Sequence, residues 1–329
     1  MSKEAGAAVV AIVKKGGCIV GAGIALALLC GLWFSSNSPL FNTVVAGKFL
    51  YYHAVLAGRF LRTGTWGDMV VPGTGGWLYY GKDLREILQP WFYAKENIET
   101  IAALSDTLGR RGITLLVVPV PDKEAIMQTY SRFTVKSVSN QRVRFLRSLR
   151  ERHVKVIDLT PTYLAANPKD ALFQKKDVHW DGQGIAVAAR EIADSVNRLP
   201  GEAGPSRYSS KDTVVDSPGF LAMFLGDSSL YPTSCRMITD AGGNPFKDSV
   251  RSDILIWGDS FTMVNRAYGG GLGAQIALYT GRPTFTIGHI GDINARAPAE
   301  MLKFLKDRPK MPKIIVWVFT SFRFMNRFE

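Results

Sequence analysis

Two short segments of this chain carry the side chains that could activate a serine for acyl transfer. Residues 177–180 read DVHW, and residues 258–261 read GDSF. A serine hydroxyl alone is a poor nucleophile, so an imidazole must take its proton, and a carboxylate can orient that imidazole and stabilise its charged form. The segments therefore predict Ser260 as a nucleophile, His179 as its general base and Asp177 as the residue that orients the base.

Ser260 is expected on a turn between a strand and a helix. Residues 253–257 are typical of a buried strand, and residues 264–279 are typical of a helix. A nucleophile on such a turn stands clear of the backbone and lies near a helix N-terminus.

Asp177 and His179 fall between an expected strand at residues 154–159 and a helix that Asp181 can cap. Reactive groups of parallel sheets gather at the carboxyl ends of the strands. Since Ser260 also follows a strand, the three side chains are expected at the same edge of one sheet.

The rest of the chain alternates strand and helix patterns, which predicts one α/β domain with a mainly parallel sheet and helices on both faces. Residues 200–218 are rich in Gly, Pro and Ser and are expected to form a connecting loop. Strands are expected at residues 113–120, 154–159, 253–257, 284–288 and 313–319, and helices at residues 94–110, 140–152, 181–197, 264–279 and 297–305.

Other motifs favour structural interpretations. A second Gly-Asp-Ser, at residues 226–228, precedes a segment that begins no helix and is predicted to be structural. His53 and His153 are expected to be packing or surface residues. His289 ends an expected strand and is the competitor for the general base, or could instead bind substrate.

No cofactor is expected. The histidines lack the helical spacing of metal ligands and have no acidic cluster beside them, so a metal site is not predicted. Glycines 269, 270, 271 and 273 lie inside the expected helix at 264–279, which favours close packing over a phosphate loop.

The net charge of +12 raises the question of nucleic acid. A basic cluster within residues 142–152 has the spacing of a solvated helix face, and no recognition motif accompanies it, so a nucleic-acid partner is not expected. The alternative for the basic charge is attraction to an acidic polymer or to anionic lipid headgroups.

Residues 16–34 contain no charged side chain and are about as long as a membrane-spanning helix. Lys14 and Lys15 precede this segment, which predicts a cytoplasmic N-terminus and an exported globular part. A cleaved signal peptide is the alternative. Only Cys235 lies beyond the apolar segment, so no internal disulfide is expected there, in keeping with a bacterial periplasm.

Three regions follow from these patterns. Residues 1–35 are expected to form a cytoplasmic stub and a single membrane anchor, residues 36–75 a juxtamembrane amphipathic segment, and residues 76–329 the α/β domain.

Over roughly residues 68–329 the sequence resembles the alginate O-acetyltransferase family, exported polysaccharide acetylation proteins with an SGNH-hydrolase-like domain. The matching segments are GWLYY at 76–80, DVHW at 177–180 with Gly184 after it, and GDSF at 258–261. Ordinary SGNH hydrolases place the serine block first and the Asp/His block last. The reversed order here points to the acetylation branch.

The resemblance implies a three-layer SGNH-hydrolase-like domain whose serine, at Ser260, accepts an acetyl group. It also implies a multi-spanning membrane-bound O-acyltransferase as acetyl donor, a polysaccharide acceptor and other exopolysaccharide secretion components as partners, at the periplasmic face of the inner membrane. One departure is the last strand, VWVF at 316–319, which lacks the family's acidic residue after tryptophan. Candidates for oxyanion or substrate contacts are Asn265, His289, Trp180 and Arg323.

The leading hypothesis is an O-acetyltransferase that forms an acetyl-serine intermediate and passes the acetyl group to a polysaccharide hydroxyl. A deacetylating esterase that uses the same three residues is an alternative, because the difference lies in how the site admits sugar and excludes water. A non-catalytic scaffold or polymer-binding component of a secretion complex is the other alternative.

Overall fold

The computed structural model describes residues 69–81, 83–84, 93–132, 140–166, 171–200, 208–288, 297–320 and 328. The expected anchor at residues 16–34 and the juxtamembrane amphipathic segment before residue 69 lie outside these residues. No helix in the described part is long and apolar enough to cross a membrane. Residues 71–329 group into one compact unit.

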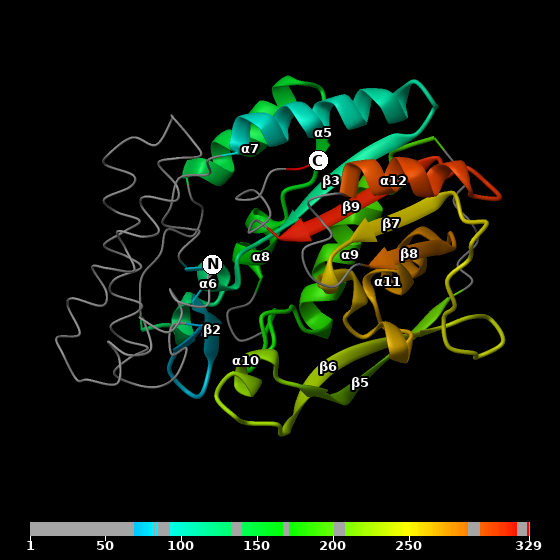
Figure 1. The fold of residues 1–329 in the computed structure, drawn as a ribbon. Coiled ribbons are helices and arrows are strands. Elements are labelled where there is room, and N and C mark those ends of the chain that lie inside the picture. Colours follow the sequence, from blue (N-terminus) through cyan, green and yellow to red (C-terminus); the bar gives the residue numbers. More distant parts are fainter. Residues whose placement is uncertain are drawn as a thin grey trace, which may run out of the picture. The chain divides into compact units, whose positions relative to one another are not determined.

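A five-stranded sheet forms the centre of this unit (Figure 1). The strand order is β4-β3-β9-β7-β8, and every neighbouring pair is parallel, as the sequence predicts. The strands are β3 (Thr114–Val120), β4 (Lys155–Val156), β7 (Ile254–Gly258), β8 (Thr284–Gly288) and β9 (Ile314–Thr320).

β4 is shorter than the expected strand at residues 154–159. After Ile157, whose N–H still donates to Val117 in β3, the chain turns into α8 (Thr160–Ala165). The Asp158 carboxylate accepts the Thr160 N–H, and Pro161 lies in the first turn of the helix. Both features favour a helix start over continued pairing.

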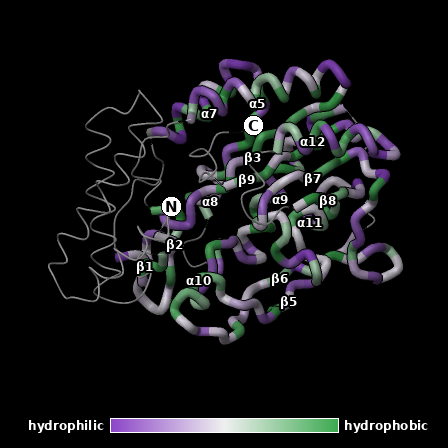
Figure 2. The backbone as a smooth tube through the Cα atoms, in the orientation of Figure 1, coloured by the Kyte–Doolittle hydropathy of each residue, from purple (hydrophilic) through white to green (hydrophobic). Residues whose placement is uncertain are grey.

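Helices cover both faces of the sheet and make a three-layer unit (Figure 1). Alternate residues of β3 face opposite cores: Leu116 and Val118 pack with α9 and α11, whereas Leu115 and Val117 pack with α5, α7 and α12. Figure 2 shows hydrophobic residues along the central strands and hydrophilic residues along much of α7. The helices are α5 (Ala94–Gly109), α7 (Asn140–Glu151), α9 (Gly182–Asn197), α11 (Leu272–Thr280) and α12 (Ala297–Lys306).

Two small antiparallel elements lie outside the main sheet. β1 (Val70–Pro72) pairs with β2 (Leu78–Tyr80), and β5 (Ser209–Pro218) pairs with β6 (Leu230–Thr239). The prediction of a loop at 200–218 is therefore wrong for Ser209–Pro218. That strand is mostly polar because it lies on an exposed two-stranded ribbon, where pairing with β6 rather than burial holds it extended.

The expected helix at 264–279 is also wrong in its first half. Two short 3₁₀ segments, η2 (Ser260–Met263) and η3 (Arg266–Tyr268), precede α11. Asn265 and Gly269 have φ of 57° and 68°, in the left-handed region that interrupts a right-handed helix.

The predicted packing role of the glycines after Ser260 is confirmed at two positions, although Gly270 precedes α11 rather than lying inside a helix. A Cβ on Gly270 would lie 2.6 Å from the Cys235 sulfur, and one on Gly273 would lie 2.4 Å from the Thr286 hydroxyl oxygen. These contacts bring β6 and β8 close to α11 and the turn before it.

Candidate active site

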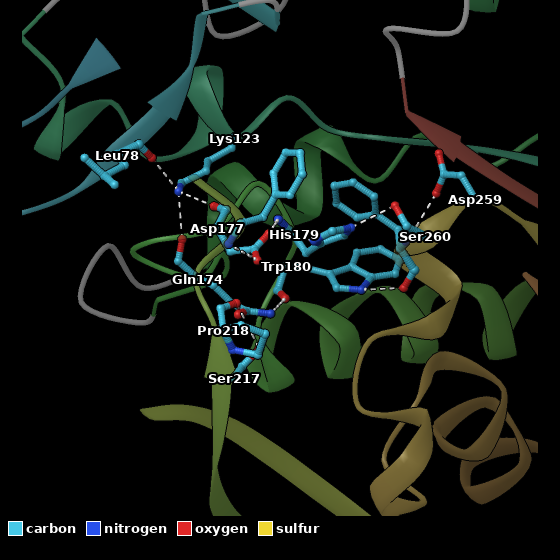
Figure 3. Close-up of polar contacts among 12 residues, drawn as sticks. Leu78, Lys123, Gln174, Asp177, His179, Trp180, Ser217, Pro218, Asp259 and Ser260 are labelled. Carbon is cyan, nitrogen blue, oxygen red and sulfur yellow. Dashed lines mark hydrogen bonds and ion pairs between the residues drawn. The ribbon is translucent and has the colours of Figure 1, made fainter. Parts of the chain in front are cut away.

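The structure brings Asp177, His179 and Ser260 into one line of contacts (Figure 3). The Nδ1 atom of His179 lies 2.6 Å from Oδ1 of Asp177, and its Nε2 atom lies 2.8 Å from the Ser260 Oγ. A carboxylate beside Nδ1 holds the ring proton there, so Nε2 presents a lone pair to the serine hydroxyl. This arrangement can remove a proton from Ser260 as its oxygen attacks a carbonyl.

Asp177 is only 6% exposed, and both of its carboxylate oxygens are occupied. Oδ1 also accepts the His179 backbone N–H at 3.1 Å, and Oδ2 accepts the Phe220 backbone N–H at 2.9 Å. Burial acts to raise the pKa of Asp177, but the hydrogen bonds and charge of His179 and the two backbone donors outweigh it, so the pKa lies below its usual value. The carboxylate is thus kept ionised and held in one orientation.

Ser260 lies on a tight turn that follows β7, and β7 lies between β8 and β9 in the sheet. Asp259 fixes this turn: its Oδ1 accepts the Phe261 N–H and its Oδ2 accepts the Thr320 N–H at the end of β9, each at 3.0 Å. Gly258 allows the close approach, since a Cβ there would lie 2.5 Å from the Val318 carbonyl oxygen. Ser260 lies on a turn, as predicted, but the turn begins a 3₁₀ segment, and the helix expected at residues 264–279 does not begin until Leu272.

His179 is positioned by the start of α9. The Asp181 carboxylate accepts the N–H groups of Gln183 and Gly184, which confirms the predicted N-cap. Its second oxygen accepts the Ser234 hydroxyl at 2.9 Å, so the cap is also tied to β6. The loop that carries His179 therefore ends at a fixed point.

The structure places the remaining candidates differently. Trp180 is fully buried, and its Nε1–H donates to the Phe261 carbonyl, so it supports the site rather than lining it for substrate. The Asn265 amide donates to the Ser234 carbonyl at 3.0 Å, so this hydrogen bond joins Asn265 to β6 rather than to Ser260. His289 and Arg323 lie outside the described residues.

The motifs interpreted as structural are found at turns. Asp227 of the second Gly-Asp-Ser accepts hydrogen bonds from the Ser229 N–H and the Tyr231 hydroxyl, and this confirms the prediction of a structural turn. His153 is exposed at the end of α7, as expected, whereas His53 lies outside the described residues.

Sequence reasoning missed two groups that hold Asp177. One is the Phe220 N–H at the start of α10 (Phe220–Met223), which no sequence pattern identifies. The other is Lys123, which begins α6 (Lys123–Ile126) and donates to the Asp177 carbonyl. Its signal is its place just after β3, at the carboxyl edge of the sheet. No cluster of three or more potential metal ligands occurs in the described part of the chain.

A three-layer α/β unit with a parallel sheet and a serine after a central strand is the arrangement expected of an SGNH-hydrolase-like domain. Residues 70–321 match the family model described as "SGNH hydrolase-like domain, acetyltransferase AlgX". The chain belongs to this family, which confirms the resemblance to the alginate O-acetylation proteins.

Two curated relatives carry names from alginate biosynthesis. The chain is 25% identical over 249 residues to the alginate biosynthesis protein AlgX of Azotobacter vinelandii. This alignment covers 68% of the chain and 49% of that protein. It is 25% identical over 198 residues to the probable alginate O-acetylase AlgJ of Pseudomonas putida, and this second alignment covers 53% of the chain and 51% of that protein. The chain thus spans about half the length of these relatives.

Solved structures show the same fold at lower identity. The O-acetyltransferase domain of Pseudomonas putida AlgJ superimposes with a TM-score of 0.61 at 20% identity and covers 78% of this chain and 92% of that domain. Pseudomonas aeruginosa AlgX gives a TM-score of 0.59 at 19% identity and covers 78% of this chain and 62% of that chain.

Proposed function

We propose that this protein transfers acetyl groups to hydroxyls of an exported polysaccharide, with Ser260 as the acetyl carrier. The observation that carries the proposal is the line of contacts from Asp177 Oδ1 through the His179 ring to the Ser260 Oγ, at 2.6 and 2.8 Å. Membership of the AlgX acetyltransferase family supports acyl transfer as the chemistry of that line.

In the first half-reaction, the Ser260 Oγ bonds to the acetyl carbon of the donor while its proton passes to His179 Nε2. The bond between the acetyl carbon and the donor's leaving group then breaks, and the leaving group takes that proton from Nε2. In the second, a sugar hydroxyl gives its proton to Nε2 and bonds to the acetyl carbon, the bond to Oγ breaks, and Ser260 regains a proton.

Asp177 stabilises the imidazolium that forms in each half-reaction. The Ser260 backbone N–H is the candidate donor to the oxyanion, a role for which backbone amides are suited. Because the oxyanion forms in both half-reactions, the same donor serves both.

The location and partners of the protein are part of the same proposal. Residues 16–34 would anchor the chain in the inner membrane, with the domain in the periplasm. A multi-spanning membrane O-acyltransferase would supply the acetyl group, and other polysaccharide secretion components would lie nearby. The net charge of +12 suits an acidic polymer such as alginate as acceptor.

The test uses the full chain in detergent, as wild type, Ser260→Ala and Ser228→Ala. Ser228 is the matched control because it is the serine of the second Gly-Asp-Ser turn. Each protein is mixed with an activated acetyl ester and acidic or neutral oligosaccharides, and the sugars are weighed by mass spectrometry.

Acetylated sugar from the wild type and Ser228→Ala, but not from Ser260→Ala, is the expected result. Acetate release that depends on Ser260 but leaves every sugar unmodified would favour the esterase. Equal background with all three proteins would overturn the serine mechanism and favour the scaffold.

A further inference from the structure

Lys123 is a buried lysine whose ammonium form has an acceptor for each of its three hydrogens. The side chain is only 4% exposed, and its Nζ donates to the carbonyl oxygens of Leu78 and Gln174, each at 2.7 Å, and of Asp177 at 2.6 Å (Figure 3). An ammonium has three donors, so this geometry uses all of them. Two segments far apart in the sequence, at residue 78 and at residues 174–177, therefore meet at the Lys123 Nζ atom.

The surroundings of Lys123 are aromatic and acidic. Its Nζ lies 5.3 Å from the centre of the Trp77 ring and 5.4 Å from that of Tyr79. Burial lowers the pKa of Lys123, while the nearby carboxyl groups of Glu124, Asp177 and Asp83 act in the opposite direction. A buried cation is costly unless it is fully hydrogen-bonded, as it is here.

The contact with Asp177 has a direct geometric consequence. Lys123 holds the Asp177 carbonyl, while the N–H groups of Phe220 and His179 hold its carboxylate. The residue is therefore fixed at both ends, so its carboxylate cannot turn away from the His179 ring without breaking one of these contacts. A displacement of about 1 Å at a reacting group can lower the rate about 100-fold.

We propose that Lys123 is a positioning residue, which acts through the Asp177 backbone to keep the carboxylate against His179 Nδ1. The inference deepens the proposed function and rests on it. In this role Lys123 makes no contact with the substrate. It follows β3, whereas the other members of the site belong to the DVHW and GDSF segments.

Arg142 supplies a matched control. It too is a buried cation that donates to backbone carbonyls, those of Pro119 and Val120, and it pairs with Asp158. These contacts lie at the carboxyl end of β3 but do not include Asp177. A loss of stability alone should therefore affect the Arg142 variant as much as the Lys123 variant.

The experiment compares full-length wild type, Lys123→Met, Lys123→Gln, Arg142→Met and Ser260→Ala in detergent, below their melting transitions. Methionine keeps an unbranched side chain without hydrogen-bond donors, whereas glutamine keeps uncharged donors. If the methionine variant does not fold, the glutamine variant still tests the role of Lys123. The readouts are kcat and KM for an activated acetyl ester across pH, and the low-field proton NMR signal of an imidazole Nδ1–H bonded to a carboxylate.

Lys123→Met is expected to lower kcat by about 10- to 100-fold with KM little changed, and to weaken or abolish the low-field signal. Removal of the amine beside Asp177 should also change the pH profile of kcat. Lys123→Gln should fall between, and Arg142→Met should keep the signal and the profile.

The inference would be overturned if a folded Lys123 variant had wild-type kcat, pH profile and low-field signal, and Ser260→Ala abolished turnover in the same assay. Equal losses in the Lys123 and Arg142 variants would overturn it as well, since stability alone would then explain both. If Ser260→Ala leaves turnover unchanged, the proposed function fails and the role of Lys123 in it fails too. The low-field signal still reports separately whether Lys123 holds the hydrogen bond.

Discussion

The indole Nε1–H of Trp180 donates to the carbonyl oxygen of Phe261 at 3.0 Å, so the residue after His179 is tied to the residue after Ser260. The two rings also meet edge to face, with centroids 5.4 Å apart, and the Phe261 ring lies 4.7 Å from the His179 ring. The segments that carry His179 and Ser260 therefore share one buried junction.

Trp180→Phe tests this junction. The change removes the indole donor and leaves the buried Phe261 carbonyl without it, which should cost about 1–3 kcal/mol in the free energy of unfolding. Turnover of an acetyl ester should fall by about 10- to 100-fold, because His179 and Ser260 lose their common support. Denaturant unfolding and kinetics on the same preparation measure both effects.

Trp317→Phe is the control for Trp180→Phe. Trp317 is equally buried, on the opposite face of the sheet, and its Nε1 has no hydrogen-bond partner within the described residues. The control should lose stability through packing alone and keep its turnover. If both variants lose turnover in proportion to stability, the junction has no separate role.

Asp177→Asn tests the carboxylate at nearly constant shape. The amide cannot stabilise the imidazolium, and it no longer fixes the ring proton on Nδ1, so kcat should fall by about 10³- to 10⁴-fold. Asp227→Asn, in the second Gly-Asp-Ser turn, is the control and should keep wild-type kcat. A fall of less than tenfold in Asp177→Asn would contradict the assigned role of Asp177.

Asp177 also predicts a pH dependence of stability. Its pKa is lower in the folded protein than its usual value, so its contribution to stability is present above the usual carboxyl pKa and is lost as pH falls through the folded value. Wild type should therefore lose stability in acid more steeply than Asp177→Asn. Urea unfolding of both proteins at several acidic pH values measures the difference, and parallel curves would contradict it.

Much of the fold could be predicted because buried strands and helices have recognisable patterns of apolar residues in the sequence. The apolar runs of β3, β7 and β9 are buried on both faces, and the place of Ser260 after β7 follows from that pattern. The meeting of Asp177 and His179 with Ser260 could be predicted because their segments, DVHW and GDSF, both follow strands of an expected parallel sheet.

The errors have one physical cause, which is that backbone pairing and turns are not recorded by apolar periodicity. β5 is extended because β6 pairs with it, although its side chains are mostly exposed and polar. The helix after Ser260 is interrupted because Asn265 adopts a left-handed conformation, which no apolar spacing signals. Lys123 and the Phe220 N–H were missed for the same reason, since their partners are backbone atoms or distant in sequence.

Gly258→Ala tests whether close packing sets the position of Ser260. The new Cβ would lie 2.5 Å from the Val318 carbonyl oxygen and 2.4 Å from the Thr262 methyl carbon, so the turn must shift. The expected cost is about 1–3 kcal/mol in the free energy of unfolding, with a lower kcat because Ser260 lies two residues away.

Gly109→Ala is the matched control for Gly258→Ala. A Cβ on Gly109, at the end of α5, would meet nothing within 4 Å among the described residues. Alanine there should leave stability unchanged or raise it by up to about 1 kcal/mol, and turnover should not change. Wild-type kcat in Gly258→Ala would show that the turn can move without consequence for the reaction.

Glu124 gives a prediction of the opposite sign from Asp177. Its carboxyl is buried, Oε1 accepts the Tyr80 N–H, and Oε2 has no partner in the described part of the chain. Burial raises its pKa from 4.5 to about 7. Between these two values the folded protein holds a proton that the unfolded chain has lost, so stability should fall as pH rises from about 4.5 to about 7.

Glu124→Gln removes this titration and keeps an oxygen for the Tyr80 N–H. Any cost of the amide itself is the same at every pH, so the informative quantity is the change in the difference between variant and wild type. From pH 5 to pH 8 that difference in unfolding free energy should move in favour of the variant by more than about 1 kcal/mol. Denaturant unfolding at both pH values measures it, and a difference independent of pH would mean that burial does not hold the Glu124 carboxyl in its protonated form.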